Sequence, residues 1–481
     1  MPPPTIATSY RSTPRTIGSA AVNGTERRAK LARSSLYLVL EARPGGRDPA
    51  ALLEAALRGG VDIVQLRDKE LPDDELVRAA EPFRRACGAH GALFLLNDRP
   101  DLVERTGADG VHVGQGDAPL AEARRAVGPD AIVGLSATTA AELHGDPDYF
   151  GVGAIFGTPT KPESAAGGLE LVRAARDALR VPWFAIGGIE ADNVDEVVAH
   201  GAPGIAIVRA IRDAGDPEDA ARTLRAKLPP SRVVVTQFGE AKLPQIDWLP
   251  STRSGAQSPV PPHTHAVHTD LFYVLEGELE FRLGDGTVRV PAGTCVAALP
   301  LLVHGFRNPG DVEARFLNLH APGVWARGQE HGLPRAEYDQ FGPDRASSVP
   351  RPIVSAPGDG DRLTKPHRLA LVKVRSHDAD VLEYFADAEY DGADDHVHLR
   401  HADCFHVLEG ELEFRVDGET IRAQAGTSVV VPPGVVHAFT SVGRARFLNV
   451  HAPSCGFAEY LQRVDAGEAV DAAAYDSYAL D

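Results

Sequence analysis

Two acidic residues in the first half of the chain follow neighbouring predicted strands, where they could bind a metal ion. Asp98 comes after the apolar run 92–96, and Asp117 follows the short apolar segment 110–113. In an alternating β/α chain, consecutive parallel strands lie side by side, so residues just past their carboxyl ends meet at one rim. Two carboxylates that meet there repel each other unless a hard divalent cation lies between them. The pattern indicates a divalent metal site, with two solvated loop acids as the alternative.

Cationic and small polar residues follow most of the other predicted strands in this half. A Gly-Gly turn lets backbone N–H groups approach an anion, and the seventh and eighth loops of a β/α barrel usually bind phosphate. The residues concerned are Arg67 and Lys69 after the second strand, Ser136 at the end of the fifth, Thr158, Thr160 and Lys161 after the sixth, and Gly187 and Gly188 after the seventh. Together they predict a cation-lined pocket for phosphorylated ligands beside one metal ion.

A series of strand-and-helix units must position these residues. The predicted strands are residues 36–40, 62–66, 92–96, 110–113, 132–135, 149–153, 183–186 and 204–208, and helical patterns include residues 49–58, 73–89 and 169–179. So many short units within residues 35–228 predict an α/β fold, a compact (β/α)8 TIM barrel. A doubly wound sheet is the alternative, and it is weakened because no G-x-G-x-x-G motif follows the first strand.

The composition limits what the chain can be. Its 481 residues suggest two or three domains, and 43% hydrophobic residues are enough for substantial cores. The formal net charge of −18 argues against nucleic-acid binding, and no apolar run is long enough to cross a membrane. Residues 1–34 are rich in Pro, Ser, Thr and Arg, which predicts a disordered leader, with a transit peptide as the alternative. Four cysteines without C-x-x-C spacing indicate buried thiols in a reducing, cytoplasmic compartment: Cys87, Cys295, Cys404 and Cys455.

The barrel half also carries a series of longer motifs. They are QLRDK from Gln65, NDRPDL from Asn97, ADGVHVGQGD from Ala108, DYFGVGAIFGTPTK from Asp148, AIGGI from Ala185 and GIAIVRAI from Gly204. In this order they resemble the thiamine phosphate synthase family. In that family a pyrimidine diphosphate loses pyrophosphate to give a cation at its exocyclic methylene, and the nitrogen of a thiazole phosphate captures that cation. The resemblance implies a transferase of thiamine biosynthesis whose partners are these two small molecules.

The resemblance also implies a role for each residue that matches a family motif. Asp98 and Asp117 match the acids that hold Mg²⁺, and Gln65 matches the position beside the pyrimidine. The positions that ligate the diphosphate are Arg67, Lys69, Asn97, Ser136 and Lys161, of which all but Asn97 are expected to be catalytic. The positions at the thiazole phosphate are Thr158, Thr160, Gly188, Val208 and Arg209.

Two of the departures from the family pattern lie at and after the end of the fifth predicted strand. Thr138 stands where the family usually has a histidine two residues after the serine. The related thiazole tautomerases rely on that histidine, so Thr138 counts against tautomerase activity. The segment 136–149 is also short by about one helical turn, which predicts a trimmed crossover helix. A catalytically silent barrel is therefore the alternative to an active synthase.

The second half of the chain repeats itself. HTHAVHTDLFYVLEGELEFRL from His263 recurs as HVHLRHADCFHVLEGELEFRV from His396, and the offset of 133 residues also carries His304 to His437. Repeats of this length with alternating strands and Gly/Pro turns predict two copies of an all-β jelly roll, in residues 229–345 and 346–481. Residues 229–262 become Pro- and Ser-rich toward their end, as a linker or the approach to a new domain would.

Both repeats resemble the cupin family, which makes this half a bicupin. Each carries H-x-H, then an acid, then a later histidine, and period-two spacing directs the H-x-H pair to one side of a strand. Three nitrogens and one oxygen suit Fe, Mn, Ni or Zn. The expected ligands are His263, His265, Asp270 and His304 in the first copy, and His396, His398, Asp403 and His437 in the second.

Details of the cupin pattern leave several roles open. The family normally has glutamate in place of Asp270 and Asp403, so the shorter acid has less reach. His268 and His401 recur as well, as partners of the ligands or as spare ligands. Both fold families often self-associate, which is compatible with a homo-oligomer. The preferred function is synthesis of thiamine phosphate with the cupins as a sensing or accessory module. The alternative makes the cupins the enzyme, an oxygenase or isomerase, and the barrel a phosphate-ligand sensor.

Overall fold

Parallel strands of the first half close into a barrel. The computed structural model describes residues 24–157, 166–343 and 351–479. Within them, each barrel strand pairs with the next and β8 pairs with β1. The strands are β1 (Leu36–Leu40), β2 (Ile63–Leu66), β3 (Leu93–Asn97), β4 (Gly110–Val113), β5 (Ile132–Ala137), β6 (Tyr149–Val152), β7 (Trp183–Ile186) and β8 (Ile205–Ile207). The predicted TIM barrel is confirmed, with strand ends within two residues of the predicted ones.

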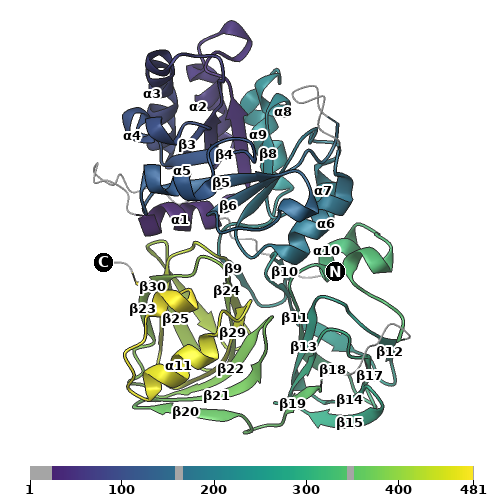
Figure 1. Cartoon of the computed structure of the whole chain (residues 1–481). Helices are drawn as coiled ribbons and strands as arrows, with labels where there is room; N and C mark the ends of the chain where they lie inside the picture. The colour runs from purple at the N-terminus through teal and green to yellow at the C-terminus, as the bar shows by residue number, and fades with distance from the viewer. Residues whose placement is uncertain (1–23, 158–165, 344–350, 480–481) are drawn as a thin grey trace.

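Helices cover the outside of this barrel (Figure 1). They are α2 (Ala50–Arg58), α3 (Asp73–His90), α4 (Val103–Thr106), α5 (Leu120–Val127), α6 (Gly168–Ala178), α7 (Val194–Ala199), α8 (Arg209–Arg212) and α9 (Pro217–Ala226). Between β5 and β6 the crossover contains only the 3-10 helix Ala140–Glu142. The shortened segment predicted at this position is therefore present as a single short turn.

The predicted disordered leader contains a helix, α1 (Gly24–Ala32). Leu31 is buried in the core inside the barrel, and Arg27 pairs with Asp109 at 3.0 Å, just before β4. Arg28 pairs with Asp148, just before β6, at 2.8 Å. The helix thus covers the amino-terminal end of the barrel (Figure 1). The expectation was wrong for residues 24–32 because composition cannot reveal a polar helix held by its tertiary partners, and residues 1–23 lie outside the described part.

Each cupin is a sandwich of two antiparallel sheets. The strands of the first are β10 (Ala241–Lys242), β11 (Asp247–Ser254), β12 (Pro259–His263), β13 (Thr269–Glu276), β14 (Glu278–Leu283), β15 (Gly286–Pro291), β16 (Cys295–Ala298), β17 (His304–Arg307) and β18 (Ala314–Ala321), followed by α10 (Trp325–Glu330). Its larger sheet has the order β10-β11-β18-β13-β16-β19, in which β19 is Ile353–Ser355, and its smaller sheet has the order β12-β17-β14-β15. The predicted jelly roll is confirmed.

The second cupin has the same arrangement. Its strands are β20 (Asp361–Lys365), β21 (Arg368–Arg375), β22 (Asp380–Ala386), β23 (Ala393–Val397), β24 (Ala402–Glu409), β25 (Glu411–Val416), β26 (Glu419–Gln424), β27 (Ser428–Val431), β28 (His437–Ser441), β29 (Ala445–Ala452) and β30 (Tyr478–Ala479), with α11 (Phe457–Asp465) before the last. The sheet orders are β20-β21-β22-β29-β24-β27-β9, in which β9 is Val234–Thr236, and β26-β25-β28-β23-β30.

The two cupins exchange edge strands. β9 (Val234–Thr236) precedes the first cupin in the chain but pairs with β27 of the second. β19 (Ile353–Ser355) precedes the second cupin but pairs with β16 of the first. The boundaries expected at residues 229 and 346 therefore do not separate the sheets of the first cupin from those of the second. The alternation of side chains along a strand does not specify which strand it pairs with.

The Pro- and Ser-rich stretch between barrel and repeat forms strands instead of a linker. Pro250 lies where the pairing of β11 with β18 shifts register, between Leu249 and Thr252. β12 carries three prolines and is the edge strand of its sheet. Proline lacks the N–H that a central strand needs, so edges and bulges are where strands accept it.

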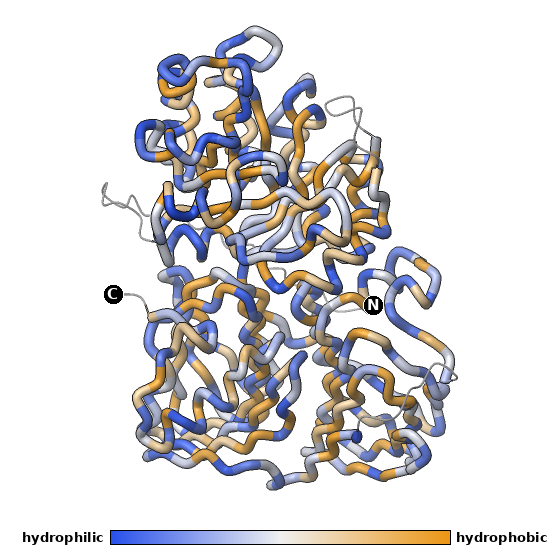
Figure 2. The backbone as a smooth tube through the Cα atoms, viewed as in Figure 1, coloured by the Kyte–Doolittle hydropathy of each residue, from blue (hydrophilic) through white to orange (hydrophobic). Residues whose placement is uncertain are grey.

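One hydrophobic core joins the cupins. It contains residues from both, among them Trp248 and Leu319 of the first and Leu448 and Val450 of the second. Figure 2 shows hydrophobic backbone segments along the barrel strands and in the strands of both sandwiches. The bicupin is thus one packed body rather than two tethered domains.

The barrel rests on the bicupin through polar contacts. Glu337 receives a hydrogen bond from Arg173 of α6 at 3.1 Å and is 2.9 Å from Nε2 of the buried His200, which follows α7. On the other side, Gly434 has φ of +79°, and a Cβ there would lie 2.2 Å from the carbonyl oxygen of Ala29. Only glycine permits this close approach of α1 to the second cupin.

The helices and the cysteines were both considered from the composition. No helix among the described residues is long and apolar enough to span a membrane. All four cysteines are free thiols, three of them buried and Cys455 half-buried. Buried thiols are what the cysteine spacing predicted.

Candidate functional site

One cavity at the carboxyl end of the barrel strands collects most of the predicted site residues. Those that line it are Gln65, Arg67, Asn97, Ser136, Gly188, Val208 and Arg209. They come from the ends of β2, β3, β5 and β8 and from the turn after β7. Active sites of β/α barrels form at this end because the loops there converge.

A continuous chain of hydrogen bonds crosses the floor of this cavity. Gln65 Nε2 donates to the Tyr37 hydroxyl at 2.6 Å, and the hydroxyls of Tyr37 and Tyr149 are 2.9 Å apart. The Tyr149 hydroxyl is 2.9 Å from Nδ1 of His112, whose Nε2 is 2.9 Å from Ser136 Oγ. Burial raises the pKa of Tyr37 and of Tyr149, so both hydroxyls stay protonated at neutral pH.

Three residues of this hydrogen-bond chain were not predicted as site residues from the sequence: Tyr37, His112 and Tyr149. The signal was present, because side chains alternate between the barrel interior and the helices, and all three lie on inward positions of β1, β4 and β6. Phe184 on β7 packs beside these residues, with the centroid of its aromatic ring 5.4 Å from that of Tyr37. From the sequence alone, a tyrosine that points into the barrel is interpreted as a core residue, because the partner of its hydroxyl group is not known.

The glycine turn after β7 packs closely against the segment that follows β6. Gly188 has φ of +63°, and a Cβ there would lie 2.8 Å from Cβ of Phe156. The turn is held by Asn193, whose Nδ2 donates to the Gly188 carbonyl at 3.0 Å. Arg209 faces the same cavity and pairs with Glu190 at 3.2 Å. Glu190 is thus a further cavity residue that the sequence did not indicate.

The two predicted magnesium ligands follow neighbouring strands, as expected, but each side chain bonds within the protein. Asp98 lies 2.7 Å from Nζ of Lys69 and has φ of +61°. The exposed Asp117 accepts a hydrogen bond from the Gly114 amide at 3.0 Å. Lys69, predicted as a diphosphate ligand, therefore has its ammonium group against Asp98. Thr158, Thr160 and Lys161 lie outside the described residues.

Thr138, which stands in the family's histidine position, organises the shortened crossover. Its amide and its hydroxyl both donate to Oε2 of Glu142, at 2.6 and 2.9 Å. The Thr138 amide is the main cause that lowers the pKa of Glu142. Thr138 also lines the cavity. The threonine thus fixes the 3-10 turn at the edge of the site, where it offers no proton-transfer group.

In each cupin the predicted ligands converge. The ligand atoms of His263, His265, Asp270 and His304 all lie within 4.8 Å of one another, and so do those of His396, His398, Asp403 and His437. We call these sets the first and second tetrads. Most of these side chains are buried, and Nε2 of His265 and of His398 has no hydrogen-bond partner among the described residues.

The histidines of the tetrads are held in one tautomer. In the first tetrad, Nδ1 of His263, His265 and His304 lies 2.6–3.0 Å from a backbone carbonyl oxygen. A carbonyl can only accept, so Nδ1 carries the hydrogen and Nε2 keeps its lone pair for a ligand. The second tetrad repeats this arrangement at 2.7–3.0 Å. An unpartnered buried Nε2 with this tautomer fits a metal ion.

The aspartates reach the tetrads despite the shorter side chain. Asp270 Oδ2 lies 3.3 Å from His304 Nε2, and Asp403 Oδ2 lies 3.2 Å from His437 Nε2. Asn318 donates to the other oxygen of Asp270 at 2.5 Å, and Asn449 does the same for Asp403. Burial alone would raise the pKa of Asp270, but the nearby histidines lower it to about 2. The asparagines therefore position both acids beside the tetrad histidines.

His268 and His401 belong to a second row of side chains. Asp339 Oδ2 accepts from His268 Nδ1 at 2.8 Å, and His268 Nε2 is 3.2 Å from His320 Nδ1. In the second cupin, Asp476, His401 and His451 repeat this row at 2.9 Å for both contacts. Asp339 and Asp476 also supply the carbonyls that hold His265 and His398. The row therefore positions one ligand of each tetrad.

Comparison with known proteins identifies both halves. The family model described as thiamine monophosphate synthase matches residues 36–211, and the cupin domain model matches residues 253–320 and 387–451. The chain is 45% identical over 207 residues to the thiamine-phosphate synthase of Acidothermus cellulolyticus, covering 42% of this chain and 98% of that protein. It is 46% identical over 208 residues to that of Thermobifida fusca, covering 42% of this chain and 95% of that protein.

A solved structure matches the same region. The thiamine phosphate pyrophosphorylase from Pyrococcus furiosus is 32% identical, covers 42% of this chain and 96% of its own, and has a TM-score of 0.38. By fold and site, the protein is a β/α-barrel transferase with a bicupin attached. The chain belongs to the thiamine monophosphate synthase family.

Proposed function

We propose that the barrel joins 4-amino-2-methyl-5-hydroxymethylpyrimidine diphosphate to a thiazole phosphate, giving thiamine phosphate and pyrophosphate. The observation that carries the proposal is the single cavity that combines two sets of side chains. Gln65, Arg67 and Ser136 suit the pyrimidine diphosphate, and Gly188 and Arg209 suit the thiazole phosphate. The thiamine-phosphate synthases that resemble this chain over nearly their whole length support the same reaction.

The reaction requires charge stabilisation more than covalent help. The C–O bond to the diphosphate breaks and its electron pair leaves with pyrophosphate, and the lone pair of the thiazole nitrogen forms the new C–N bond. Positioning and electrostatics supply most of the acceleration in such a step. The proposed diphosphate ligands are Arg67, Lys69, Asn97, Ser136 and Lys161, with Gln65 at the pyrimidine and Thr158, Thr160, Gly188, Val208 and Arg209 at the thiazole phosphate.

The hydrogen-bond chain on the cavity floor gives Ser136 a defined role. The Gln65 amide donates to Tyr37, and we assign the Tyr37 hydrogen to the Tyr149 oxygen and the Tyr149 hydrogen to Nδ1 of His112. His112 then donates from Nε2 to Ser136 Oγ. The hydroxyl hydrogen of Ser136 remains free to donate to a diphosphate oxygen. This hydrogen bond strengthens as negative charge develops on the leaving group.

Asp98 and Asp117 are the proposed magnesium ligands. Each has one carboxylate oxygen bonded, to Lys69 and to the Gly114 amide, and among the described residues the other oxygen has no hydrogen-bond partner. Hard oxygen donors of this kind suit Mg²⁺. When bound, Mg²⁺ would neutralise charge on the departing diphosphate.

Each tetrad is proposed to hold one divalent transition metal. Three imidazole Nε2 atoms and one carboxylate oxygen form a donor set suited to Fe, Mn, Ni or Zn. We assign the bicupin a sensing or accessory role, because all the residues proposed for the transfer reaction belong to the barrel sequence.

An assay of the full-length protein tests the proposal. Release of pyrophosphate from the pyrimidine diphosphate should require both the thiazole phosphate and Mg²⁺. Absence of turnover with all substrates and Mg²⁺ supplied would overturn the synthase assignment. The cupins would then be the better candidate for catalysis, with the barrel as a phosphate-ligand sensor.

A further inference from the structure

A cavity lies where the amino-terminal side of the barrel meets both cupins. Its walls include Arg180 and Trp183 of the barrel, Val324 of the first cupin, and Leu399 and Arg400 of the second. No described residue of the barrel cavity or of either tetrad lines it. This junction cavity is therefore separate from both sites already described.

The junction cavity is cationic within an acidic protein. Arg176, Arg180 and Arg400 line it with a single acid, Asp378, whereas the whole chain has a formal net charge of −18. Within the described part of the chain, no carboxylate lies within 4.0 Å of the Arg180 guanidinium. Its Nη1 donates only to the carbonyl oxygens of Asp177 and Leu179, both at 3.0 Å. The exposed Arg180 guanidinium thus acts on Asp378 only at longer range and is accessible to an anion.

The other two arginines keep only part of their donors engaged. Arg400 Nε is 3.4 Å from Asp476, and Asp476 already accepts from three backbone amides and from the ring of His401. Arg176 donates from Nε to Asp177 at 2.7 Å and from Nη1 to the carbonyl of Glu337 at 3.4 Å. Both guanidinium groups retain N–H donors for a ligand, because each has five.

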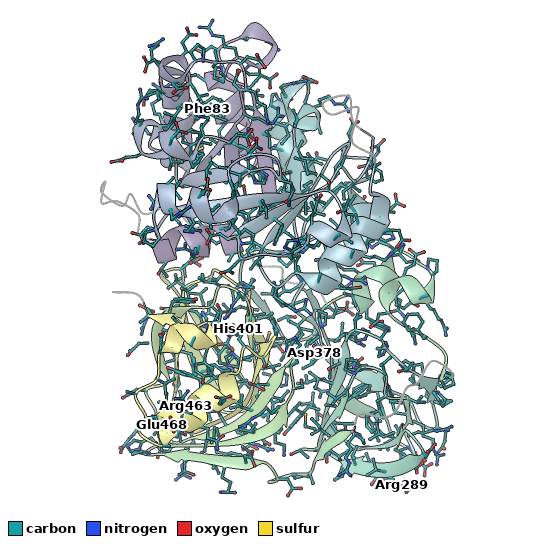
Figure 3. The ribbon with its side chains drawn as sticks, in the orientation of Figure 1. Phe83, Arg289, Asp378, His401, Arg463 and Glu468 are labelled. Atoms are coloured by element: carbon teal, nitrogen blue, oxygen red, sulfur yellow. The ribbon has the colours of Figure 1, made fainter. Side chains whose placement is uncertain are left out.

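The acid in the cavity does not cancel this charge. Asp378 lies between the two cupins beneath the barrel (Figure 3), and its Oδ2 accepts a hydrogen bond from Thr269 Oγ1 at 2.6 Å. Burial raises the pKa of Asp378, and the Thr269 hydrogen bond and the charge of Arg180 partly oppose this rise. Because three arginines and only this one carboxyl stand among the described lining residues, the arginines set the sign of the site.

The remaining walls are mostly apolar and rich in proline. Beside Trp183 they contain Pro182, Pro203, Pro244, Pro322, Pro433 and Pro453. Proline rings have no N–H to satisfy and few conformations to lose when a ligand packs on them. Such walls accept the apolar body of a ligand without the cost of burying an unpaired polar group.

We propose that the junction cavity is a binding site for a small organic anion. A phosphate or carboxylate group lies against Arg180 and Arg400, and the apolar body of the molecule lies against the prolines and Trp183. The site contacts all three parts of the molecule at once. Trp183 is followed directly by Phe184, which lines the barrel cavity, and Leu399 and Arg400 directly follow His398 of the second tetrad.

Trp183 provides a direct readout because the chain has only three tryptophans. Inorganic phosphate and, separately, acetate are titrated into the full-length protein while tryptophan emission is recorded. We expect a saturable change with a dissociation constant on the order of millimolar for at least one anion. The change should be lost in Trp183→Phe and weakened at least about tenfold in Arg180→Ala with Arg400→Ala. The anion that binds identifies the class of the head group.

Arg67→Ala is the matched control, since it removes an arginine from the barrel cavity instead. It should leave the Trp183 signal unchanged. A signal abolished by Arg67→Ala and kept in the Arg180→Ala, Arg400→Ala variant would mean that the anion binds in the barrel, and no saturable signal with either anion would mean that the junction cavity is not a site. Arg180→Lys retains the charge and should retain most of the binding, which excludes misfolding as the cause of the loss.

Discussion

At the scale of single residues, the cupin histidines are prepared for a metal by their backbone partners. Each ligand histidine donates its Nδ1 hydrogen to a carbonyl, so the three Nε2 lone pairs of a tetrad face one point. We expect metal analysis to find up to two transition ions per chain. Changing His263 and His265 to alanine should remove one of them, and His396 with His398 should remove the other.

A histidine outside the tetrads gives the control for this experiment. His367 is exposed and pairs with Asp387 and Glu389 on the surface. His367→Ala should leave both ions in place. Full metal content in the variant lacking His263 and His265 would contradict the assignment of the first tetrad.

Asp98 tests the metal assignment in the barrel. Asp98→Ala should lower kcat/KM at least roughly a hundredfold, about 2.7 kcal/mol of transition-state stabilisation, because the diphosphate would lose its counter-charge. Steady-state pyrophosphate release measures the effect. Asp101→Ala removes an acid from the same segment whose carboxylate pairs with Arg99 at the surface, and its rate should change little. A near wild-type rate for Asp98→Ala would show that the metal lies elsewhere.

His112 tests the hydrogen-bond chain. His112→Phe keeps a ring beside Tyr149 but removes the contacts to Tyr149 and to Ser136 Oγ. Ser136 would lose the partner that orients its hydroxyl, so kcat should fall about 10- to 100-fold. His112→Asn keeps a polar side chain and should lose less. Equal rates for wild type and His112→Phe would mean that the chain does not orient Ser136.

At the scale of elements, a repeated aspartate holds a short helix over each cupin. Asp247 Oδ2 accepts from the Ala326 amide at 2.8 Å, at the start of α10. Trp325, the first residue of α10, stacks on His320 with ring centroids 4.5 Å apart. In the second cupin, Asp380 accepts from the first turn of α11 at 2.8 Å. The helices are therefore fixed by caps from distant strands.

The buried cap residue Asp247 predicts that the stability of the protein depends on pH. Burial raises the pKa of Asp247 from 3.8 to about 6. The native state then binds more protons than the unfolded state between these values, so stability falls as pH rises through this window and is level above it. On lowering the pH from 7 to 5, the wild type should gain on the order of 1 kcal/mol relative to Asp247→Asn. Differences in Tm between the two proteins at each pH measure this.

Asp380 offers a matched test, because burial also raises its pKa to about 6. Asp380→Asn should show the same pH-dependent difference in Tm. A Tm difference that is equal at pH 5 and pH 7 for both variants would mean that these acids are ionised throughout.

At the scale of the whole molecule, the shared core makes the two cupins one folding unit. Leu448 of the second cupin packs in the core that also contains Leu319 of the first, whereas Leu412 packs only within the second cupin. Each change to alanine should cost about 2–5 kcal/mol. Only Leu448→Ala should reduce the hydrogen-exchange protection of strands in the first cupin. Unchanged protection there would mean that the cupins unfold independently.

Most of the fold and part of the site follow from the sequence alone. Strand positions in the barrel, the duplication and the tetrad residues are visible because hydrophobic periodicity and ligand spacing are local properties of the chain. The sequence also predicted that the side chains at the carboxyl ends of the strands lie together, because all strands of a parallel barrel end on the same side. Thr138 and the short crossover were also evident, since they are deviations at fixed positions.

Only the tertiary structure decided which partners these residues have. The contact of Lys69 with Asp98, the chain from Gln65 to Ser136, the exchange of β9 and β19 and the helix in residues 24–32 all join segments distant in sequence. Hydrogen bonds and strand pairing depend on distances of a few ångströms between such segments, and periodicity along one strand does not encode them. The sequence thus determined what chemistry the side chains could perform, and packing determined which of them meet to perform it.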